Sequence, residues 1–412
     1  MKQCENSSLL TYKIPYTMVL RLIHILLISL ILSDLYLYFR FLHGRRYRWF
    51  TYALCFLPNA ALLLAVPILI LTEDHTPANM GRMIVFFSIF LLVVMPKMLF
   101  LLADLIGKLF CLLVPKARKT CTIISSALAI ILFFIMLSGI TFGPSILKVR
   151  NLDFASSDLP TAFDGYRIVQ FSDLHLTSFQ HHPQMVNEII GTILQQEPDM
   201  IVFTGDLITI DVNELDGYEP ILSSLHAPDG VYSILGNHDY MTYASYLNKR
   251  EQALHRQQLI LRQRALGWDL LLNERRIIRR ANDSIALIGV ENYGKPPFPQ
   301  RGNLKKAMKG MEETDSLSRQ PMFKLLLSHD PTHWRMKVLP ETDIQLTLSG
   351  HTHGMQFMLF GWSPSKYFYP EWKYLYKEGE RGLYVSLGLG GALLPFRFGA
   401  WPEINVITLH HK

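Results

Sequence analysis

The stretch Leu346–Gly354 reads LTLSGHTHG, a short apolar run followed by two histidines that glycines frame. The run has the length and composition of a buried strand. In extended or turn backbone, the spacing of His351 and His353 directs their imidazoles toward neighbouring points, and glycine lets the main chain approach whatever they hold. Two histidines at this spacing are a weak signal alone, so their meaning depends on the rest of the chain.

Four shorter polar fragments upstream also follow apolar runs. They are Asp173-Leu174-His175, Gly205-Asp206, Gly236-Asn237-His238-Asp239 and Ser328-His329-Asp330. Around the first three, strand patterns (167–172, 200–203, 231–235) alternate with helical patterns (183–196, 218–225), which predicts parallel crossovers with helices covering the sheet. Ligand crevices of open α/β sheets lie beyond the carboxyl ends of the strands. We therefore expect all these fragments to meet at one edge.

The remaining elements of the globular part are expected as follows. Strands are expected at 285–290, 324–327, 346–349, 383–386 and 404–409, a polar surface helix within 240–266, and a linker or edge strand at 151–160. Residues 355–376 are rich in aromatic side chains with interspersed lysines. This segment is interpreted either as an aromatic core edge or as a surface that rests on the bilayer interface or takes a lipid chain, because amphipathic aromatics favour that zone.

The first third of the 412-residue chain is almost continuously hydrophobic. A membrane-spanning helix requires roughly 20 apolar residues. Four stretches meet this length: Met18–Phe41, Phe50–Leu71, Met83–Leu102 and Thr122–Phe142. Four such runs in succession argue against buried helices of a soluble protein. We expect an α-helical four-span membrane domain over residues 1–147 and a globular domain over residues 148–412.

Charge predicts the orientation of the spans. The connections after the first and third spans are basic, with Arg40, Arg45, Arg46 and Arg48 in one and Lys108, Lys116, Arg118 and Lys119 in the other. The middle connection, residues 72–82, carries two acidic residues and a single arginine. The positive-inside rule then places the basic connections in the cytoplasm and the globular domain outside, as part of a multi-pass cell-membrane protein. Lys2, Lys13 and Arg21 favour the opposite orientation.

The formal net charge of +6 comes partly from these flanking clusters, so no nucleic-acid partner is expected. All four cysteines lie in the hydrophobic third or its flanks, which excludes a cysteine zinc site or a disulfide framework in the globular domain. Three charged residues lie within or near the predicted spans, where a charge in hydrocarbon is unfavourable. Asp34 and Asp104 are expected to reach water from helix ends, and Lys97 is the exception.

Taken in order, the five fragments resemble the calcineurin-like metallophosphoesterase superfamily over residues 164–409. The four spans, together with Gly354-Met355-Gln356 and Pro402-Glu403-Ile404, are similar to its membrane-anchored branch, the transmembrane proteins with a metallophosphoesterase domain. The resemblance implies an α/β fold, a four-layer α-β-β-α sandwich, with two bound metal ions.

By position, the resemblance also implies which residues bind the metals. One ion would be held by Asp173, His175, Asp206 and His353, and the other by Asp206, Asn237, His329 and His351, so that Asp206 bridges them. The catalytic His238 would lie just outside the ligands, oriented by Asp239. The sequence departs from the family pattern at Thr209, where a further acidic residue often stands, so a contact around the ligands is in doubt.

The residue types make chemical sense in their own right. Carboxylates and imidazoles without thiolates suit Mn²⁺, Fe or Zn²⁺. Two metals about 3.5–4 Å apart that share a carboxylate activate water and polarise a phosphoryl oxygen. In-line attack then requires a proton for the leaving oxygen, and His238 is the natural donor. Among the other histidines, His181 and His182 are candidates for substrate contact, and His333 fits a helix after His329.

The sequence therefore predicts a membrane-anchored, metal-dependent hydrolase of phosphate mono- or diesters or pyrophosphates, with the lipid bilayer and a phosphorylated, lipid-linked substrate as partners. The alternatives are a non-catalytic membrane receptor or scaffold that keeps the fold, and a transporter that uses the spans. One activity of the family that the sequence resembles is the hydrolysis of UDP-diacylglucosamine in lipid A synthesis. That nucleotide-lipid is cytoplasmic, which conflicts with the orientation predicted from charge, whereas phospholipid or wall-polymer phosphates fit an outside site.

Overall fold

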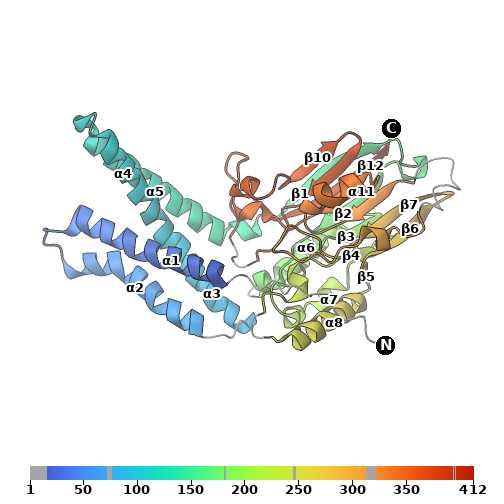
Figure 1. The fold of residues 1–412 in the computed structure, drawn as a ribbon, viewed down its shortest axis with the longest axis horizontal. Helices are drawn as coiled ribbons and strands as arrows, with labels where there is room; N and C mark the ends of the chain where they lie inside the picture. Colours follow the sequence, from blue (N-terminus) through green and yellow to red (C-terminus); the bar gives the residue numbers. More distant parts are fainter. Residues whose placement is uncertain are drawn as a thin grey trace, which may run out of the picture.

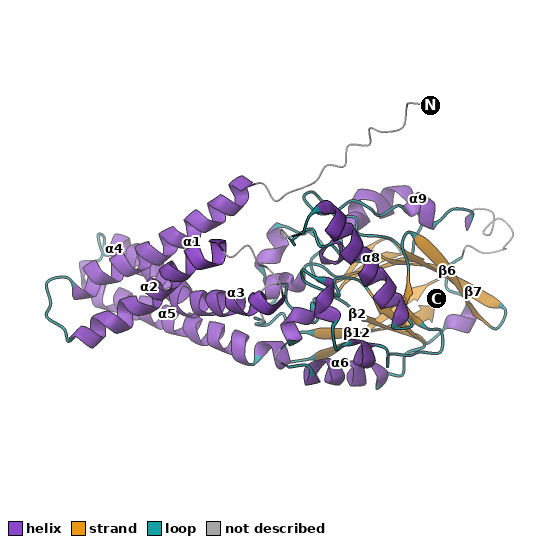
Figure 2. Cartoon of the chain, turned by 90° about the horizontal axis from the view of Figure 1, so that it is seen from below, coloured by secondary structure: helices purple, strands orange, loops and turns teal. Residues whose placement is uncertain are grey.

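The computed structural model describes residues 16–71, 77–180, 182–244, 247–311, 322–392, 394 and 396–412. It consists of a helical bundle followed by a strand-rich domain, which lie end to end (Figures 1 and 2). The bundle contains α1 (Tyr16–Leu37), α2 (Trp49–Leu71), α3 (Pro77–Ile89), α4 (Met95–Phe110) and α5 (Arg118–Thr141).

Four candidate membrane spans are present in the described residues, as the sequence predicts. The third is longer than expected, because α3 and α4 join into one apolar helix over Gly81–Phe110. A π-helical turn at Phe90–Val94 links the two just before Pro96. A wide turn shifts the main-chain hydrogen bonds there, so the missing N–H of the proline does not end the helix.

Polar side chains within the bundle pair with one another. Lys97 Nζ lies 2.8 Å from Asp34 Oδ1 and donates to the Cys55 carbonyl, while Asn59 Nδ2 donates to the same Asp34 oxygen at 2.9 Å. Asp104 accepts from Arg40 Nε at 2.8 Å. The expectation that Asp34 and Asp104 reach water from helix ends is therefore wrong. An unpaired charge in hydrocarbon is costly, so carboxylates and cations of different helices pair inside the bundle.

The two basic connections lie at the same end of the bundle. Figure 1 shows the α1–α2 and α4–α5 connections at the end remote from the strand-rich domain, while α5 returns toward that domain. After α5, a 3₁₀ turn at Gly143–Ser145 leads into β1, which begins at Lys148. The division into domains at residues 147 and 148 remains a prediction.

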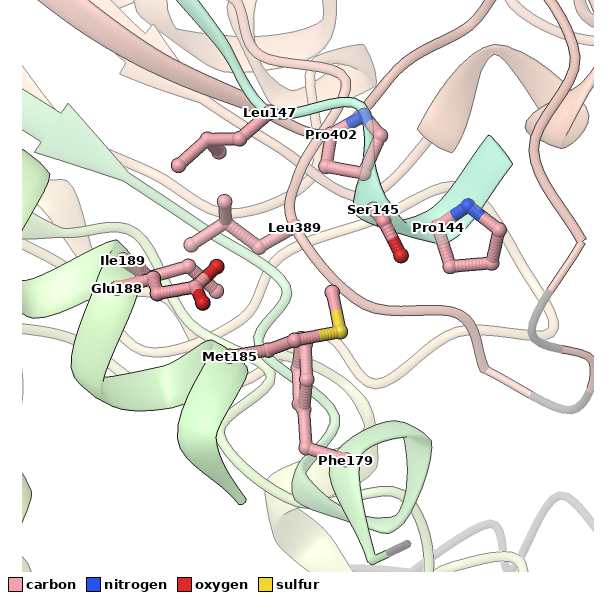
Figure 3. Close-up of a pocket in the computed structure, with 9 residues that line it drawn as sticks. All are labelled: Pro144, Ser145, Leu147, Phe179, Met185, Glu188, Ile189, Leu389 and Pro402. Atoms are coloured by element: carbon pink, nitrogen blue, oxygen red, sulfur yellow. The ribbon is translucent and has the colours of Figure 1, made fainter. Parts of the chain in front are cut away.

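A small apolar cleft marks this junction (Figure 3). The segment that leaves α5 contributes Pro144 and Leu147, and the domain contributes Phe179, Met185 and Ile189. None of the predicted metal ligands lines the cleft. It therefore belongs to the packing of the junction rather than to the predicted site.

In its described residues the domain contains two six-stranded sheets. The first has the order β1-β12-β2-β3-β4-β5 and the second β10-β11-β9-β8-β7-β6. The strands are β1 (Lys148–Ser156), β2 (Tyr166–Phe171), β3 (Met200–Phe203), β4 (Val231–Ser233), β5 (Asp269–Leu270), β6 (Glu274–Arg280), β7 (Asp283–Gly289), β8 (Lys324–Leu327), β9 (Leu346–Ser349), β10 (Tyr374–Glu378), β11 (Arg381–Val385) and β12 (Glu403–His411). The pairs β2–β3 and β3–β4 are parallel, as are β7–β8 and β8–β9.

Alternating side chains build the layers. On β3, Met200 and Val202 enter the core between the sheets, while Ile201 and Phe203 face the outer helices. Those helices are α6 (Gln184–Leu194), α7 (Glu219–Leu222) and α8 (Lys249–Ala265). The outer face of the second sheet packs against α9 (Leu304–Ala307) and the turn at Trp334–Val338, which precedes α11 (Leu339–Glu341). The predicted four-layer α-β-β-α sandwich is confirmed.

Some local expectations change. Residues 151–160 include an edge strand, since β1 pairs only with β12 among the named strands. The polar surface helix begins at Lys249, where Asn248 accepts from the amides of Arg250 and Glu251. The strands β5, β6 and β10 were not expected. The sequence of β6 is ERRIIRR, in which charged residues hide the alternation of a strand.

The Lys97–Asp34 pair provides a test of the bundle. We expect Lys97→Met to lower the free energy of unfolding by about 3 kcal/mol, because it leaves a carboxylate unpaired inside the bundle. The double variant D34N/K97M should recover most of that loss. Thermal unfolding of the purified protein in detergent measures both. Lys116→Met, at an exposed position, should change stability by less than about 0.5 kcal/mol. A double variant no more stable than K97M would contradict the assignment.

Candidate metal centre

The predicted ligands meet where the carboxyl ends of both sheets adjoin. The loops after β2, β3 and β4 come from the first sheet, and the loops after β8 and β9 come from the second. Three groups of side chains each offer ligand atoms that lie within 4.8 Å of one another. The groups are Asp173, His175 and His353; His175, Asp206 and His238; and Asp206, His329 and His351. The groups overlap at His175 and Asp206, so they form one continuous cluster.

The backbone of these loops is strained. Five of the seven predicted ligands have positive φ: Asp173 (52°), His175 (44°), Asp206 (60°), His351 (76°) and His353 (50°). A residue with a side chain in this region costs on the order of 1–3 kcal/mol and persists only where its surroundings impose the conformation. Main-chain hydrogen bonds between the loops do this, such as those from the Asp173 amide to the Gly205 carbonyl (2.9 Å) and from the Gly350 amide to the His329 carbonyl (2.9 Å). Such a concentration of strain is typical of a functional site.

Asp206 lies at the centre of the cluster and is almost fully buried. Its Oδ2 is 3.1 Å from His329 Nε2 and 3.6 Å from His175 Nε2. Its Oδ1 accepts from the main-chain N–H of His238 at 2.8 Å, which fixes the carboxylate. One oxygen thus holds the loop while the other faces histidines of both sheets, as a bridging ligand requires.

Asn237 lies between two further predicted ligands. Its Oδ1 is 3.1 Å from His329 Nε2 and 2.7 Å from His351 Nδ1. Its Nδ2 donates to the Tyr243 hydroxyl at 3.0 Å, which orients the amide oxygen toward the cluster. The side chain therefore offers an oxygen, rather than its N–H₂ group, to the two imidazoles.

Contacts outside the cluster orient two of the imidazoles. His329 Nδ1 is 2.8 Å from the Thr204 carbonyl, which only accepts, so Nδ1 carries a hydrogen and Nε2 is the nitrogen that faces the cluster. His351 has the opposite arrangement, because its Nε2 faces the Tyr369 hydroxyl (2.9 Å) and Asp330 Oδ2 (3.5 Å). Partners of this kind orient metal-binding histidines and raise their basicity.

On the other side of the cluster, His353 Nε2 lies 3.3 Å from Asp173 Oδ1. Its Nδ1 lies 3.1 Å from Nη2 of Arg397, whose guanidinium also donates to the carbonyls of Leu387, Gly390 and Ala400. Burial lowers the pKa of Arg397 to about 10, so the guanidinium remains charged at neutral pH. A buried cation thus supports the outer edge of the cluster.

The electrostatics of the cluster favour bound positive charge. Burial disfavours the charged form of His329, but the Asp206 carboxylate outweighs burial and raises the pKa of His329 to about 10. Burial also opposes ionisation of Asp206, yet His329 and His238 hold the pKa of Asp206 well below its ordinary value. His175 Nε2 is buried without a hydrogen-bond partner in the described part of the chain. These donors, nitrogen and oxygen without sulfur, fit a pair of divalent cations.

One predicted role changes in the structure. Asp239 does not orient His238, because its carboxylate accepts from the main-chain N–H groups of Gly236, Asp206, Leu207 and Ile208 at 2.9–3.3 Å. The His238 imidazole is held instead by the Thr209 carbonyl, 2.6 Å from Nδ1. Buried main-chain amides require an acceptor, and the Asp239 carboxylate supplies it for these four.

The departure at Thr209 has a structural account. Its hydroxyl lies 3.4 Å from His175 Nδ1, and its amide donates to Glu214 Oε2 at 2.8 Å. A carboxylate five residues further along the chain thus supports this loop. Of the remaining histidines, His182 is exposed and His333 packs against Ser328 in the helical segment after His329. His181 lies outside the described residues.

The sequence reasoning missed several residues that support the cluster: Tyr243, Asp330, Tyr369 and Arg397. Asp330 follows His329 directly and stood within a quoted fragment, so its position was available as a signal. Arg397 lies 44 residues from His353 in the sequence, and no local pattern links the two.

Comparison with known proteins agrees with this geometry. Residues 20–144 match a family model described as "Probable Calcineurin-like phosphoesterase, transmembrane domain", and residues 166–355 match "Calcineurin-like phosphoesterase". The uncharacterized metallophosphoesterase YkuE of Bacillus subtilis is 33% identical over 280 residues, which cover 65% of this chain and 86% of the relative. This chain belongs to the calcineurin-like phosphoesterase family. It is a metal-dependent hydrolase of phosphate esters with a membrane domain.

Two further relatives have names that refer to a membrane or to a lipid substrate. The transmembrane protein with metallophosphoesterase domain of Danio rerio is 28% identical, covering 64% of this chain and 57% of the relative. The UDP-2,3-diacylglucosamine pyrophosphatase LpxG of Chlamydia trachomatis is 28% identical, covering 63% and 88%. The solved structure of TT1561 of Thermus thermophilus aligns with a TM-score of 0.32 at 13% identity, covering 54% of this chain and 90% of that one.

The close contact between Gly236 and Asp206 in this phosphoesterase cluster leads to a testable prediction. A Cβ on Gly236 would lie 2.1 Å from Asp206 Oδ1, whereas one on Gly191 in α6 would meet nothing within 4 Å. We expect Gly236→Ala to displace the Asp206 carboxylate and lower metal affinity roughly 10–100-fold. Manganese content after gel filtration and hydrolysis of bis-p-nitrophenyl phosphate measure the loss. Gly191→Ala should retain both, and full metal content in G236A would contradict the arrangement.

Proposed function

We propose that this phosphoesterase hydrolyses a phosphodiester or pyrophosphate bond of a lipid-linked substrate, using two divalent transition-metal ions. The observation that carries the proposal is the continuous cluster of ligand atoms around Asp206, built from both sheets. The relatives add the lipid context, since one is named for a pyrophosphatase of a diacylated nucleotide sugar.

The seven residues divide into two ligand sets. Asp173, His175, Asp206 and His353 would hold one ion, and Asp206, Asn237, His329 and His351 the other. Mn²⁺, Fe or Zn²⁺ suits these donors. When bound, the ions lower the pKa of a water nucleophile and polarise the phosphoryl oxygen. The chain itself holds Asp206 and Asn237 in the orientation that this requires.

His238 is the proposed proton donor. Its Nδ1 donates to the Thr209 carbonyl, which directs Nε2 away from that contact and leaves it for the leaving oxygen. Its ring centroid lies 4.8 Å from that of His175 and 4.5 Å from that of Tyr243, so the imidazole is confined beside the cluster. Asp239 acts indirectly, because its carboxylate joins the loop that carries Asp206 to the loop that carries His238.

The two roles separate experimentally. Asp206→Asn should lose bound metal and hydrolysis together. His238→Gln should keep its metal but lower kcat roughly 10²–10⁴-fold on an alkyl phosphodiester, because general acid–base groups contribute about that much. Its loss on bis-p-nitrophenyl phosphate should be smaller, since p-nitrophenolate leaves without a proton.

Metal analysis and kinetics with both substrates measure these effects. The exposed His226→Gln, at a position with no predicted role in the site, is the matched control and should resemble the wild type. Wild-type metal content and hydrolysis in D206N would refute the proposed function. An equal loss on both substrates in H238Q would refute only the role of His238 as acid.

The side of the membrane forms part of the proposal. Both basic connections lie at the end of the bundle remote from the catalytic domain, which supports a domain outside the cytoplasm under the positive-inside rule. A phospholipid or another lipid-linked phosphate of the outer surface fits this side better than a cytoplasmic nucleotide-lipid. Hydrolysis assays with phosphatidylglycerol and with UDP-2,3-diacylglucosamine distinguish the two classes.

Orientation itself is testable. We expect alkaline phosphatase fused after Lys412 to be active, because that enzyme matures only outside the cytoplasm, and a fluorescent protein that matures only in the cytoplasm to remain dark. Fusions within the α1–α2 connection should give the opposite pattern. If the fluorescent protein were bright after Lys412 and alkaline phosphatase were active only in the α1–α2 connection, the domain would lie in the cytoplasm.

A further inference from the structure

A tight turn with an aromatic tip projects from residues 355–368, which we name the interfacial loop. The amide of Leu359 donates to the Trp362 carbonyl at 2.9 Å, and the amide of Trp362 returns the bond at 3.0 Å. Phe360 and Gly361 between them both have positive φ, 50° and 78°, the geometry of a type I′ turn. Asn, Asp and Gly are preferred at these positions. A phenylalanine here is strained, and at 99% exposure it stabilises nothing within the chain.

Other side chains of the loop have the same character. Tyr367 and Phe368 are 71% and 64% exposed. Lys366 Nζ lies 5.1 Å from the centre of the Tyr367 ring, and Lys373 Nζ donates to the Gly361 carbonyl at 2.9 Å, which holds the turn. Exposed aromatic side chains next to lysines are typical of protein surfaces that lie in the headgroup zone of a bilayer. There the rings lie at the apolar boundary and the amines contact lipid phosphates.

The interfacial loop is tied to the last membrane helix. The amide of Met358 donates to the Phe398 carbonyl at 2.7 Å, and the amide of Phe398 donates to the Gln356 carbonyl at 3.0 Å. The neighbouring amide, that of Arg397, donates to the carbonyl of Gly139 in α5 at 2.9 Å. Contact there is close, since a Cβ on Gly139 would lie 2.2 Å from the Phe396 ring. The loop is thus fixed beside the point where α5 ends.

The other side of the loop reaches the metal cluster. Ser363 Oγ donates to the carbonyl of Gly354, which follows His353, at 2.6 Å. Directly after the loop, the Tyr369 hydroxyl lies 2.9 Å from His351 Nε2. A short, internally bonded segment therefore connects the end of a membrane helix with two predicted metal ligands.

We propose that the interfacial loop inserts Phe360 into the headgroup region of the leaflet at which α5 ends, and that a lipid-linked substrate reaches the metal cluster along this loop. Insertion is independent of the proposed function, whereas substrate access rests on it. The occupant is the bilayer rather than a protein, because the loop adjoins a spanning helix and combines aromatic tips with lysines.

Insertion is measured on the full chain in vesicles of phosphatidylglycerol and phosphatidylethanolamine. A nitroxide is attached at F360C after the four native cysteines are replaced by serine. The matched control is Ala281→Cys, because Ala281 is also exposed, has a positive φ of 53°, and lies at the tip of the β6–β7 hairpin at the far end of the domain (Figure 2). We expect the nitroxide at 360 to be more accessible to oxygen than to a water-soluble nickel chelate, and the one at 281 to show the reverse.

Two results would overturn insertion. Equal access of the nickel chelate to both positions would mean that the tip lies in water. Low access of both reagents at position 360, with spin coupling between copies, would mean that a second copy of the chain covers the tip.

Substrate access is measured by kinetics. The substrate is whichever of the two lipids the wild type hydrolyses, presented in vesicles. We expect Phe360→Ser to lower kcat/KM for it about tenfold, because the variant loses the burial of one aromatic ring. Hydrolysis of bis-p-nitrophenyl phosphate should be unchanged, and Ala281→Ser should match the wild type on both. An equal loss on both substrates, or no loss on either, would refute access along the loop. A wild type that hydrolyses neither lipid substrate would instead refute the lipid-linked part of the proposed function, while the nitroxide result still decides insertion.

Discussion

The burial of the Asp206 carboxylate is the constraint on which the site depends. A charged group removed from water needs compensation from cations or hydrogen bonds. The fold supplies both from opposite directions. The His329 imidazolium approaches one carboxylate oxygen from the second sheet, while the His238 amide of the first sheet donates to the other oxygen. Neither sheet alone completes this environment, so the cluster exists only where the carboxyl ends of the two sheets meet.

The sandwich makes the strained loops tenable. Five cluster residues in the left-handed region cost together roughly 5–15 kcal/mol, at about 1–3 kcal/mol each. The strands that precede them are buried on both faces, between the sheets and beneath the helices. Such strands cannot shift without opening a core, so the loops cannot relax by moving them. Asp239 then satisfies four amides of the loops after β3 and β4 at once, which leaves these loops one arrangement.

The sequence revealed the strand ends but not the contacts between loops. Apolar runs before Asp173, Asp206 and His351 predict buried strands, and the polar residues after them predict where ligands gather. Which acceptor a given imidazole finds depends on the path of each loop in space. For that reason Thr209, rather than Asp239, holds His238. Arg397 carries no local signal at all, because only the folded chain brings it to His353.

Sequence periodicity did not predict β6, and hydropathy did not predict the polar pairs of the helical bundle. The alternating pattern of β6 is hidden because five of its seven residues are charged. In the membrane domain, hydropathy located the spans, yet it says nothing about which faces of the helices meet. Asp34 and Asp104 therefore looked like helix-end residues, although the packed bundle pairs them with Lys97 and Arg40.

Arg397 shows how the membrane and the cluster are held at a fixed separation. Its amide bonds to the Gly139 carbonyl near the end of α5, and its guanidinium contacts His353. Both contacts are made by the same residue, one by its backbone and the other by its side chain. That side chain is buried, and three carbonyls fix its orientation. A flexible linker would let the domain tumble above the bilayer at many distances. Here the last helix and a predicted metal ligand share a single rigid partner, so the height of the cluster above the bilayer is set by packing rather than by chain length.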